Sequence, residues 1–187
     1  GESVAPILAL EIARRGSIQD CRTIYCGSFS KTLSPGLRVG WAVAAKPVIA
    51  QMVLMKQAAD LHSATLNQMA VHQVAEKCFD DHVAMLRQVY GGRRDAMLQA
   101  LQDYMPAGVD WTRPKGGMFV WLTLPKGLEA TELLARALET QNIAFVPGQA
   151  FYADGGNGNT IRLSFSALPE ADIREGIRRL GVLLRGD

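Results

Sequence analysis

Short apolar segments typical of strands alternate along this chain with longer segments that carry apolar residues at helical spacing. Glycine, proline and other small turn residues separate the two kinds of segment. The segments expected to form strands are 22–25, 37–44, 109–112, 118–124, 143–146 and 160–165. The segments expected to form helices are 47–59, 66–79, 81–104, 131–140 and 169–184. This order predicts an α/β fold.

The composition of the chain changes near residue 80, which indicates a boundary between two domains. We expect residues 1–80 to form a loop-rich part that carries the chemistry. Residues 81–187 have the order of a compact βαβ-like unit.

The second part is expected to open with a long helix that Asp80 or Asp81 can cap. Gly91 and Gly92 lie inside this helix, and each costs about 1 kcal/mol of helix propensity relative to alanine. We therefore expect a bend or a locally weak turn at the two glycines.

The chain has 187 residues, of which 48% are hydrophobic, and this composition excludes a disordered, fibrous or disulfide-scaffold protein. A formal charge of +2 is too balanced for a protein whose main partner is nucleic acid. Cys21, Cys26 and Cys78 lack C-x-x-C spacing, which indicates reduced thiols. No apolar stretch approaches the roughly 20 residues of a membrane span, and the start lacks the layout of a signal peptide. We expect a cytoplasmic protein without membrane contact.

The densest group of reactive side chains lies on the loop between the first two expected strands. Ser28, Ser30, Lys31 and Arg38 stand within eleven residues there. Hydroxyls and a guanidinium suit a phosphate, and an amine beside a cationic group is easily deprotonated and can bond to a carbonyl. The combination fits pyridoxal 5′-phosphate, which carries an aldehyde and a phosphate on one ring. Taken alone, an S-x-S-K segment is also typical of a solvated turn.

A second candidate is Arg162, which alternates with Ile161 and Leu163 on an expected strand. Its side chain is therefore expected on the face away from the apolar residues, as in the lining of a cleft. Bidentate binding of a carboxylate is the chemistry that arginine favours. The alternative is a strand arginine that points to solvent.

Three histidines, His62, His72 and His82, raise the question of a metal site. The expected elements are broken between them, so no helix face brings the three together. We expect no metal.

Five ordered blocks of the sequence resemble the class I aminotransferases of fold type I, especially the branch of the 2-aminoadipate and kynurenine aminotransferases. The blocks are GSFSKTLSPGLRVGW at 27–41, KQAADLHSATLNQ at 56–68, RPKGGMFVW at 113–121, VPGQAFY at 146–152 and NTIRLSFS at 159–166. The resemblance implies that Lys31 is the Schiff-base lysine and proton shuttle, and that Ser28, Ser30 and Arg38 hold the cofactor phosphate. It also implies that Arg162 binds the substrate α-carboxylate.

The same resemblance makes Gly117 a pocket candidate, although a plain hairpin turn also explains it. Asn67 is a further pocket candidate, although a polar residue on a helix is commonly a surface residue. The implied substrates are an L-amino acid and a 2-oxo acid, and the implied assembly is a homodimer.

The family is about twice as long as this chain, and the part without a counterpart here is its N-terminal half. The resemblance makes residues 1–80 the C-terminal remnant of a large cofactor domain and residues 81–187 the small C-terminal domain. The N-terminal half supplies the aspartate for the pyridine nitrogen, so the isolated chain is expected to be inactive. Two alternatives stay open: the effector domain of a GntR-type transcriptional regulator, which binds cofactor and amino acid without turnover, and a folded module without a working site.

Overall fold

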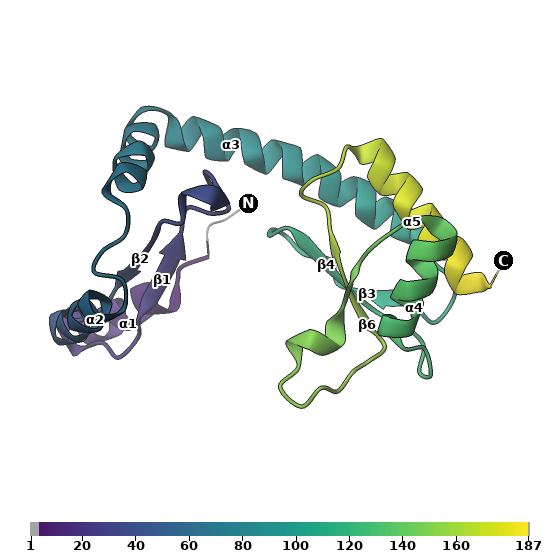
Figure 1. Ribbon diagram of the computed structural model, residues 1–187, viewed down its shortest axis with the longest axis horizontal. Coiled ribbons are helices and arrows are strands. Elements are labelled where there is room, and N and C mark those ends of the chain that lie inside the picture. Colours follow the sequence, from purple (N-terminus) through teal and green to yellow (C-terminus); the bar gives the residue numbers. More distant parts are fainter. Residues whose placement is uncertain (1–3, 187) are drawn as a thin grey trace. The chain divides into compact units, whose positions relative to one another are not determined.

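The computed structural model describes residues 4–186 and divides the chain into two compact units, Gly1–Ala84 and Met85–Asp187 (Figure 1). None of the helices within the described residues combines the length and apolar character that a membrane span requires.

The first unit combines helices with a two-stranded antiparallel hairpin. Strand β1 pairs with β2 so that Tyr25 lies opposite Val43 and Ser28 lies opposite Gly40. The elements of this unit are α1 (Ile7–Arg15), β1 (Tyr25–Ser28), β2 (Gly40–Val43), α2 (Lys46–Ala59) and the start of α3 (Thr65–Tyr104). Two 3₁₀ turns, at Ile18–Asp20 and Pro35–Leu37, complete it.

The first expected strand of this unit is displaced by three residues, and the second is shorter than the sequence pattern indicates. The prediction of a strand at 22–25 is wrong except at Tyr25, because the carboxylate of Glu11 binds the chain just before it. Glu11 accepts hydrogen bonds from the backbone N–H of Arg22 at 3.1 Å and from the backbone N–H and hydroxyl of Thr23 at 3.0 and 2.6 Å. Helix α1, which carries Glu11, was not predicted.

The bonds to Glu11 give this unit a defined response to acid. The hydroxyl of Thr23, the backbone N–H groups of Arg22 and Thr23 and the side chain of Arg15 lower the pKa of Glu11 to about 2. Since the folded pKa lies below that of an unfolded glutamate, the stabilisation is complete above about pH 4.5 and is lost as the pH falls towards 2.

We expect Glu11→Gln to remove this acid response, since glutamine offers one neutral acceptor oxygen where four donors converge. The hydrogen-exchange protection of the Arg22 and Thr23 amides, corrected for intrinsic rates, measures the effect. Protection in the wild type falls between pH 4.5 and 2, whereas in Glu11→Gln it is already low at pH 7. The control is Glu76→Gln, which removes only an exposed pair with His72. Equal protection in wild type and Glu11→Gln contradicts the prediction.

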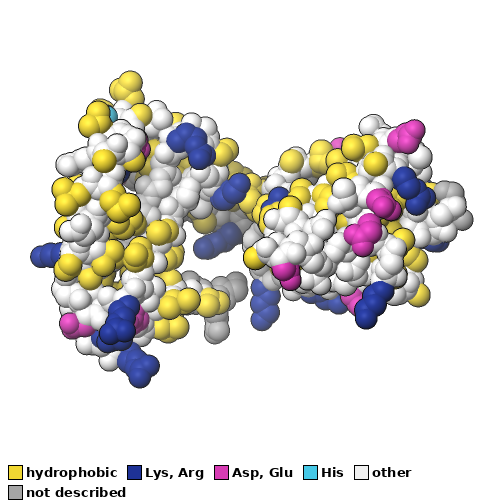
Figure 2. Space-filling view, turned by 60° about the horizontal axis from the view of Figure 1, so that its bottom comes forward, with side chains coloured by type: hydrophobic (Ala, Val, Ile, Leu, Met, Phe, Trp, Pro, Cys, Tyr) yellow, Lys and Arg dark blue, Asp and Glu magenta, His cyan; other side chains and the backbone are white. Residues whose placement is uncertain are grey.

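The first unit buries few apolar side chains, and Figure 2 shows many of them at its surface. Its buried residues are Leu8, Cys21, Ala44, Ala45 and Val71. Large side chains such as Ile7, Leu54, Met55, Leu66 and Met69 are exposed.

The expected bend at Gly91 and Gly92 is not present, and that prediction is wrong. Helix α3 instead departs from helical geometry at Cys78, with φ −150° and ψ 17°. Asp80 and Asp81 lie inside the helix and do not cap it. At the glycines the side chain of Glu170 lies close to the helix, since a Cβ on Gly92 would lie 2.5 Å from its carboxylate, whereas Gly91 has open space beside it.

The second unit is a four-stranded antiparallel sheet with helices packed on one face (Figure 1). The strands lie in the order β3 (Asp110–Trp111), β4 (Phe119–Thr123), β6 (Thr160–Ser164) and β5 (Val146–Pro147). The helices are the C-terminal part of α3, α4 (Ala130–Arg136), a π-helical turn at Ala137–Gln141 and α5 (Glu170–Arg185). Because β4 and β5 both run antiparallel to β6, β4–α4–β5 is a βαβ unit split by β6.

Alternation along the strands sets the core of this unit. Val120, Leu122, Ile161 and Leu163 are buried against the helices, whereas the residues between them face the other side of the sheet. Helix α5 adds the predicted apolar stripe, Ile173, Ile177, Leu180 and Leu184, of which the first three are buried. Gly181 allows close approach, since a Cβ there would lie 2.4 Å from the carbonyl oxygen of Tyr104.

Candidate active site

The loop between β1 and β2 holds the first group of candidate residues, and its base is closed by backbone hydrogen bonds. The N–H of Phe29 donates to the carbonyl of Val39 at 3.1 Å. The hydroxyl of Ser28 donates to that of Ser30 at 2.9 Å and accepts from the Ser30 N–H at 3.1 Å. Ser28 and Ser30, two of the three predicted phosphate ligands, therefore lie together at the end of β1.

Arg38 follows a 3₁₀ turn and adopts the left-handed conformation, with φ 51° and ψ 40°. Its guanidinium donates one hydrogen bond, to the carbonyl of Pro35 at 3.1 Å, and bonds no other described residue. The amide of Asn67 donates to the carbonyl of Leu37 at 2.9 Å, so helix α3 fixes the loop one residue before Arg38. The remaining guanidinium N–H groups are available to an anion.

Lys31 lies exposed in the turn that follows Ser30. The turn is held by the carbonyl of Phe29, which accepts from the N–H groups of Leu33 at 2.8 Å and Ser34 at 3.1 Å. The Phe29 ring packs edge-on against Phe79 with 6.2 Å between centroids. Lys31 makes no ion pair or side-chain hydrogen bond with the described residues, so its amine is available for covalent chemistry.

Arg162 lies in the second unit, on β6, between its strand partners Trp121 and Val146. Its side chain is on the face of the sheet away from the core, as the sequence pattern predicts. The guanidinium carbon lies 4.2 Å from the ring centroid of Phe119 and 4.6 Å from that of Phe151. No carboxylate among residues 4–186 pairs with it, which leaves its N–H groups for an external acid.

Gly117 occupies the turn between β3 and β4, with φ +83° and open space where a Cβ would lie. Ser28, Ser30, Lys31, Arg38 and Asn67 belong to the unit that ends at Ala84, whereas Gly117 and Arg162 belong to the other unit.

Two of the histidines, His62 and His72, have separate partners. His62 contacts the carbonyl of Ser63 at 2.8 Å, and His72 lies 3.5 Å from the carboxylate of Glu76. Within residues 4–186, no group of three or more histidine, cysteine or acidic side chains could hold a metal.

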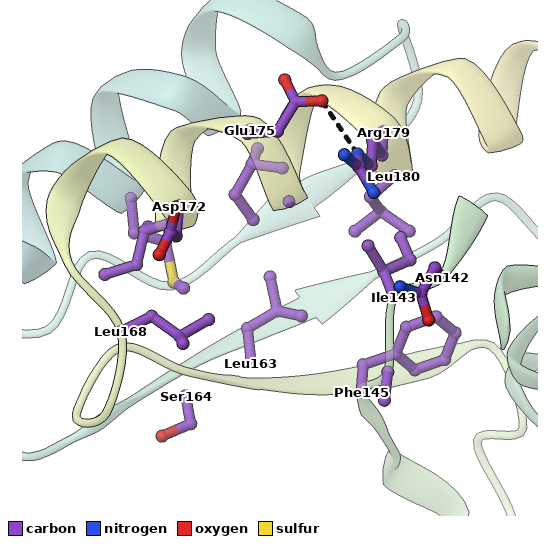
Figure 3. Close-up of a pocket in the computed structure, with 15 residues that line it drawn as sticks. Asn142, Ile143, Phe145, Leu163, Ser164, Leu168, Asp172, Glu175, Arg179 and Leu180 are labelled. Atoms are coloured by element: carbon purple, nitrogen blue, oxygen red, sulfur yellow. Dashed lines mark hydrogen bonds and ion pairs between the residues drawn. The ribbon is translucent and has the colours of Figure 1, made fainter.

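A cavity of about 490 Å³ opens in the second unit between α5, the end of β6 and residues 142–145 (Figure 3). Its lining includes Leu163, which alternates with Arg162 on β6, so the cavity lies on the opposite face of the sheet from the arginine. Arg178 and Arg179 hydrogen-bond Glu175 at its edge and lower the pKa of that carboxyl to about 2. No predicted site residue lines this cavity.

Comparison with known proteins decides the family, since residues 4–180 match the family described as aminotransferase class I and II. The chain belongs to this aminotransferase family. It is 50% identical over 186 residues to a 2-aminoadipate transaminase of Thermus thermophilus, covering 100% of the chain and 46% of that protein. It is 42% identical to aromatic-amino-acid aminotransferase 1 of Thermococcus litoralis, covering 99% of the chain and 43% of the relative.

The fold agrees with the same family. The crystal structure of LysN, an α-aminoadipate aminotransferase of Thermus thermophilus complexed with N-(5′-phosphopyridoxyl)-L-leucine, matches with a TM-score of 0.92 and 49% identity. The match covers 100% of the chain and 47% of that structure. The predicted membership and the α/β class, as part of a fold-type-I aminotransferase, are confirmed. The chain spans less than half the length of the curated relatives it matches.

More distant relatives include a helix-turn-helix transcriptional regulator of Bacillus subtilis, 35% identical over 87% of the chain and 33% of the regulator.

The sequence analysis of this aminotransferase chain did not identify the two rings that contact Arg162. Phe119 lies in the expected strand 118–124, two residues after Gly117, and Phe151 lies in the block VPGQAFY. Alternation along β4 could have placed Phe119 on the same face as Arg162. Nothing local to the sequence places Phe151 there.

Proposed function

We propose that this chain is part of a pyridoxal-phosphate-dependent aminotransferase that exchanges an amino group between an L-amino acid and a 2-oxo acid. The observation that carries the proposal is the loop between β1 and β2, where an unpaired amine lies among phosphate-binding groups. The fit with pyridoxal phosphate comes from these donors: the hydroxyls of Ser28 and Ser30 and the guanidinium of Arg38 suit the phosphate, and the amine of Lys31 suits the aldehyde.

Each residue has a defined task in this proposal. Ser28, Ser30 and Arg38 would hold the phosphate of the cofactor, and Lys31, on the same loop, would bind its aldehyde. Bound pyridoxal phosphate supplies an electron sink for the charge that develops at the substrate α-carbon. With the cofactor bound, Lys31 would bond to the aldehyde through its amine and would move the proton taken from the substrate α-carbon.

On the substrate side, Arg162 binds the α-carboxylate through two parallel N–H···O bonds. We place Gly117 and Asn67 along the substrate pocket, with Asn67 also holding the loop at Leu37. The names of the relatives, 2-aminoadipate and aromatic-amino-acid aminotransferases, support amino acids of that size as substrates.

We further propose that residues 1–80 complete a large cofactor domain and that residues 81–187 form the small domain of a cytoplasmic homodimer. The exposed apolar side chains of the first unit support this proposal, because a domain that was complete in this chain would bury more of them.

Borohydride trapping tests the proposal, because it makes the reversible bond between an amine and an aldehyde permanent. The protein is incubated with pyridoxal phosphate, reduced, digested and mapped by mass spectrometry. We expect the phosphopyridoxyl mass on the peptide that contains Lys31. Label on another lysine, or none in the whole protein, contradicts the assignment.

A second candidate function is an effector domain of a transcriptional regulator that binds cofactor and amino acid without turnover. The regulator of Bacillus subtilis that matches 87% of the chain supports it. Both candidates predict label on Lys31, so amino transfer to 2-oxoglutarate distinguishes them: turnover by the labelled protein supports the enzyme.

A further inference from the structure

The guanidinium of Arg162 lies against two phenyl rings that come from different parts of the second unit. Phe119 begins β4, where it pairs with Ser164, two residues along β6 from the arginine. Phe151 ends the 3₁₀ turn Gly148–Phe151, which follows β5. The distances from the guanidinium carbon to the ring centroids, 4.2 and 4.6 Å, are within the range of cation–π contact.

The second ring is held in place by its surroundings. Trp121, the strand partner of Arg162, packs edge-on against Phe151 at 5.6 Å and against Tyr152 at 6.1 Å. The turn lies so close to the sheet that a Cβ on Gly148 would lie 2.7 Å from Trp121 and 2.1 Å from the hydroxyl of Thr160. The position of Phe151 beside the arginine therefore depends on a glycine that lets the turn close onto β4 and β6.

We infer that Phe119 and Phe151 are positioning residues that hold the Arg162 guanidinium for a carboxylate ligand. This inference rests on the proposed role of Arg162 in substrate binding. A guanidinium has flat faces that stack on rings and N–H groups that point outward in its plane. Contacts with the rings restrict its rotation without using the N–H groups that a carboxylate needs. A ligand then pays less of the entropic cost of ordering a long, flexible side chain.

The test reads the guanidinium directly by NMR in cofactor-free protein. An aromatic ring that faces a proton shifts the NMR signal of that proton upfield. The Arg162 Nε–H signal is assigned by its absence in Arg162→Lys. We expect it upfield of the Nε–H signals of other arginines. Phe119→Leu and Phe151→Leu remove the rings but keep apolar bulk. We expect each to return the signal towards the ordinary position, and Phe119→Tyr and Phe151→Tyr to restore the upfield shift. The Nε–H of Arg113, which lies over Trp111, is the internal control and stays in place.

A titration with propionate, followed on the same signal, measures the effect on carboxylate binding. We expect each leucine variant to raise the dissociation constant about two- to five-fold, the range that an exposed cation–π contact supplies, and each tyrosine variant to return it to the wild-type value. An Arg162 signal that is unchanged in both leucine variants overturns the inference. Unchanged propionate affinity in those variants also overturns it.

Failure of the proposed function gives a different result. If the wild-type Arg162 signal does not move with propionate, the carboxylate role of the arginine is wrong, and the inference that depends on it fails as well. If borohydride labels no lysine while propionate still binds at Arg162, the cofactor assignment fails and the inference about the rings stands.

Discussion

We expect Lys31→Ala to lower amino transfer to 2-oxoglutarate by at least about 10²- to 10⁴-fold, the range that loss of a positioned acid–base group produces. The substitution removes both the amine that bonds to the cofactor and the group that moves the substrate proton. The binding groups stay, because Ser28 and Ser30 are joined to each other and Arg38 is held through Pro35. The measurement is the rate constant kcat of the whole protein with saturating pyridoxal phosphate.

The matched control is Lys46→Ala, which removes an exposed lysine of the same unit at the start of α2. We expect its activity to equal that of the wild type. If Lys31→Ala keeps the wild-type kcat, another amine carries the chemistry and the assignment of Lys31 is wrong. Added methylamine can restore part of the activity of Lys31→Ala, because a small amine can occupy the space of the lost side chain.

The second large effect concerns stability. Phe165 is 1% exposed, follows β6 and is the largest of the fully buried side chains. Its N–H donates to the carbonyl of Met118 at 3.1 Å, so both its ring and its backbone join β6 to β4. We expect Phe165→Ala to lower the free energy of unfolding of the second unit by about 3–5 kcal/mol, through lost burial and the cavity left behind.

The free energy of unfolding of the second unit is measured in urea, with amide exchange of β4 and β6 as the readout. Leu168→Ala is the control, since Leu168 is 53% exposed and a surface substitution typically changes stability by no more than about 0.5 kcal/mol. A Phe165→Ala cost no larger than the control cost contradicts the description of the core.

Apolar periodicity predicted most of the second unit because its elements bury one side against each other, but the strand expected at 143–146 overlaps β5 only at Val146. Ile173, Ile177 and Leu180 repeat at helical spacing and are buried, and the alternation around Arg162 gives the correct face of β6. The first unit was harder to predict. Glu11 accepts hydrogen bonds from Arg22 and Thr23, eleven and twelve positions along the chain, and no local sequence pattern predicts such a contact.

The candidate site shows the same limit. The loop from Ser28 to Arg38 could be identified because its chemistry lies in consecutive residues. The rings beside Arg162 depend on the pairing of β4 with β6 and on the close approach of the turn at Gly148, which are tertiary facts. The kink at Cys78 lies next to the interruption expected between the helices at 66–79 and 81–104, although no glycine marks its position.

The alternation along β6 has a consequence for how proteins with this sheet can diverge. Ile161 and Leu163 pack against the helices, while the side chain of Arg162 between them contacts the rings of Phe119 and Phe151 on the open face. Substitutions at the open positions can therefore accumulate without cost to the core, and substitutions at the buried positions cannot. The chemistry of the open face of this sheet can therefore change while the packing of the sheet against the helices is kept.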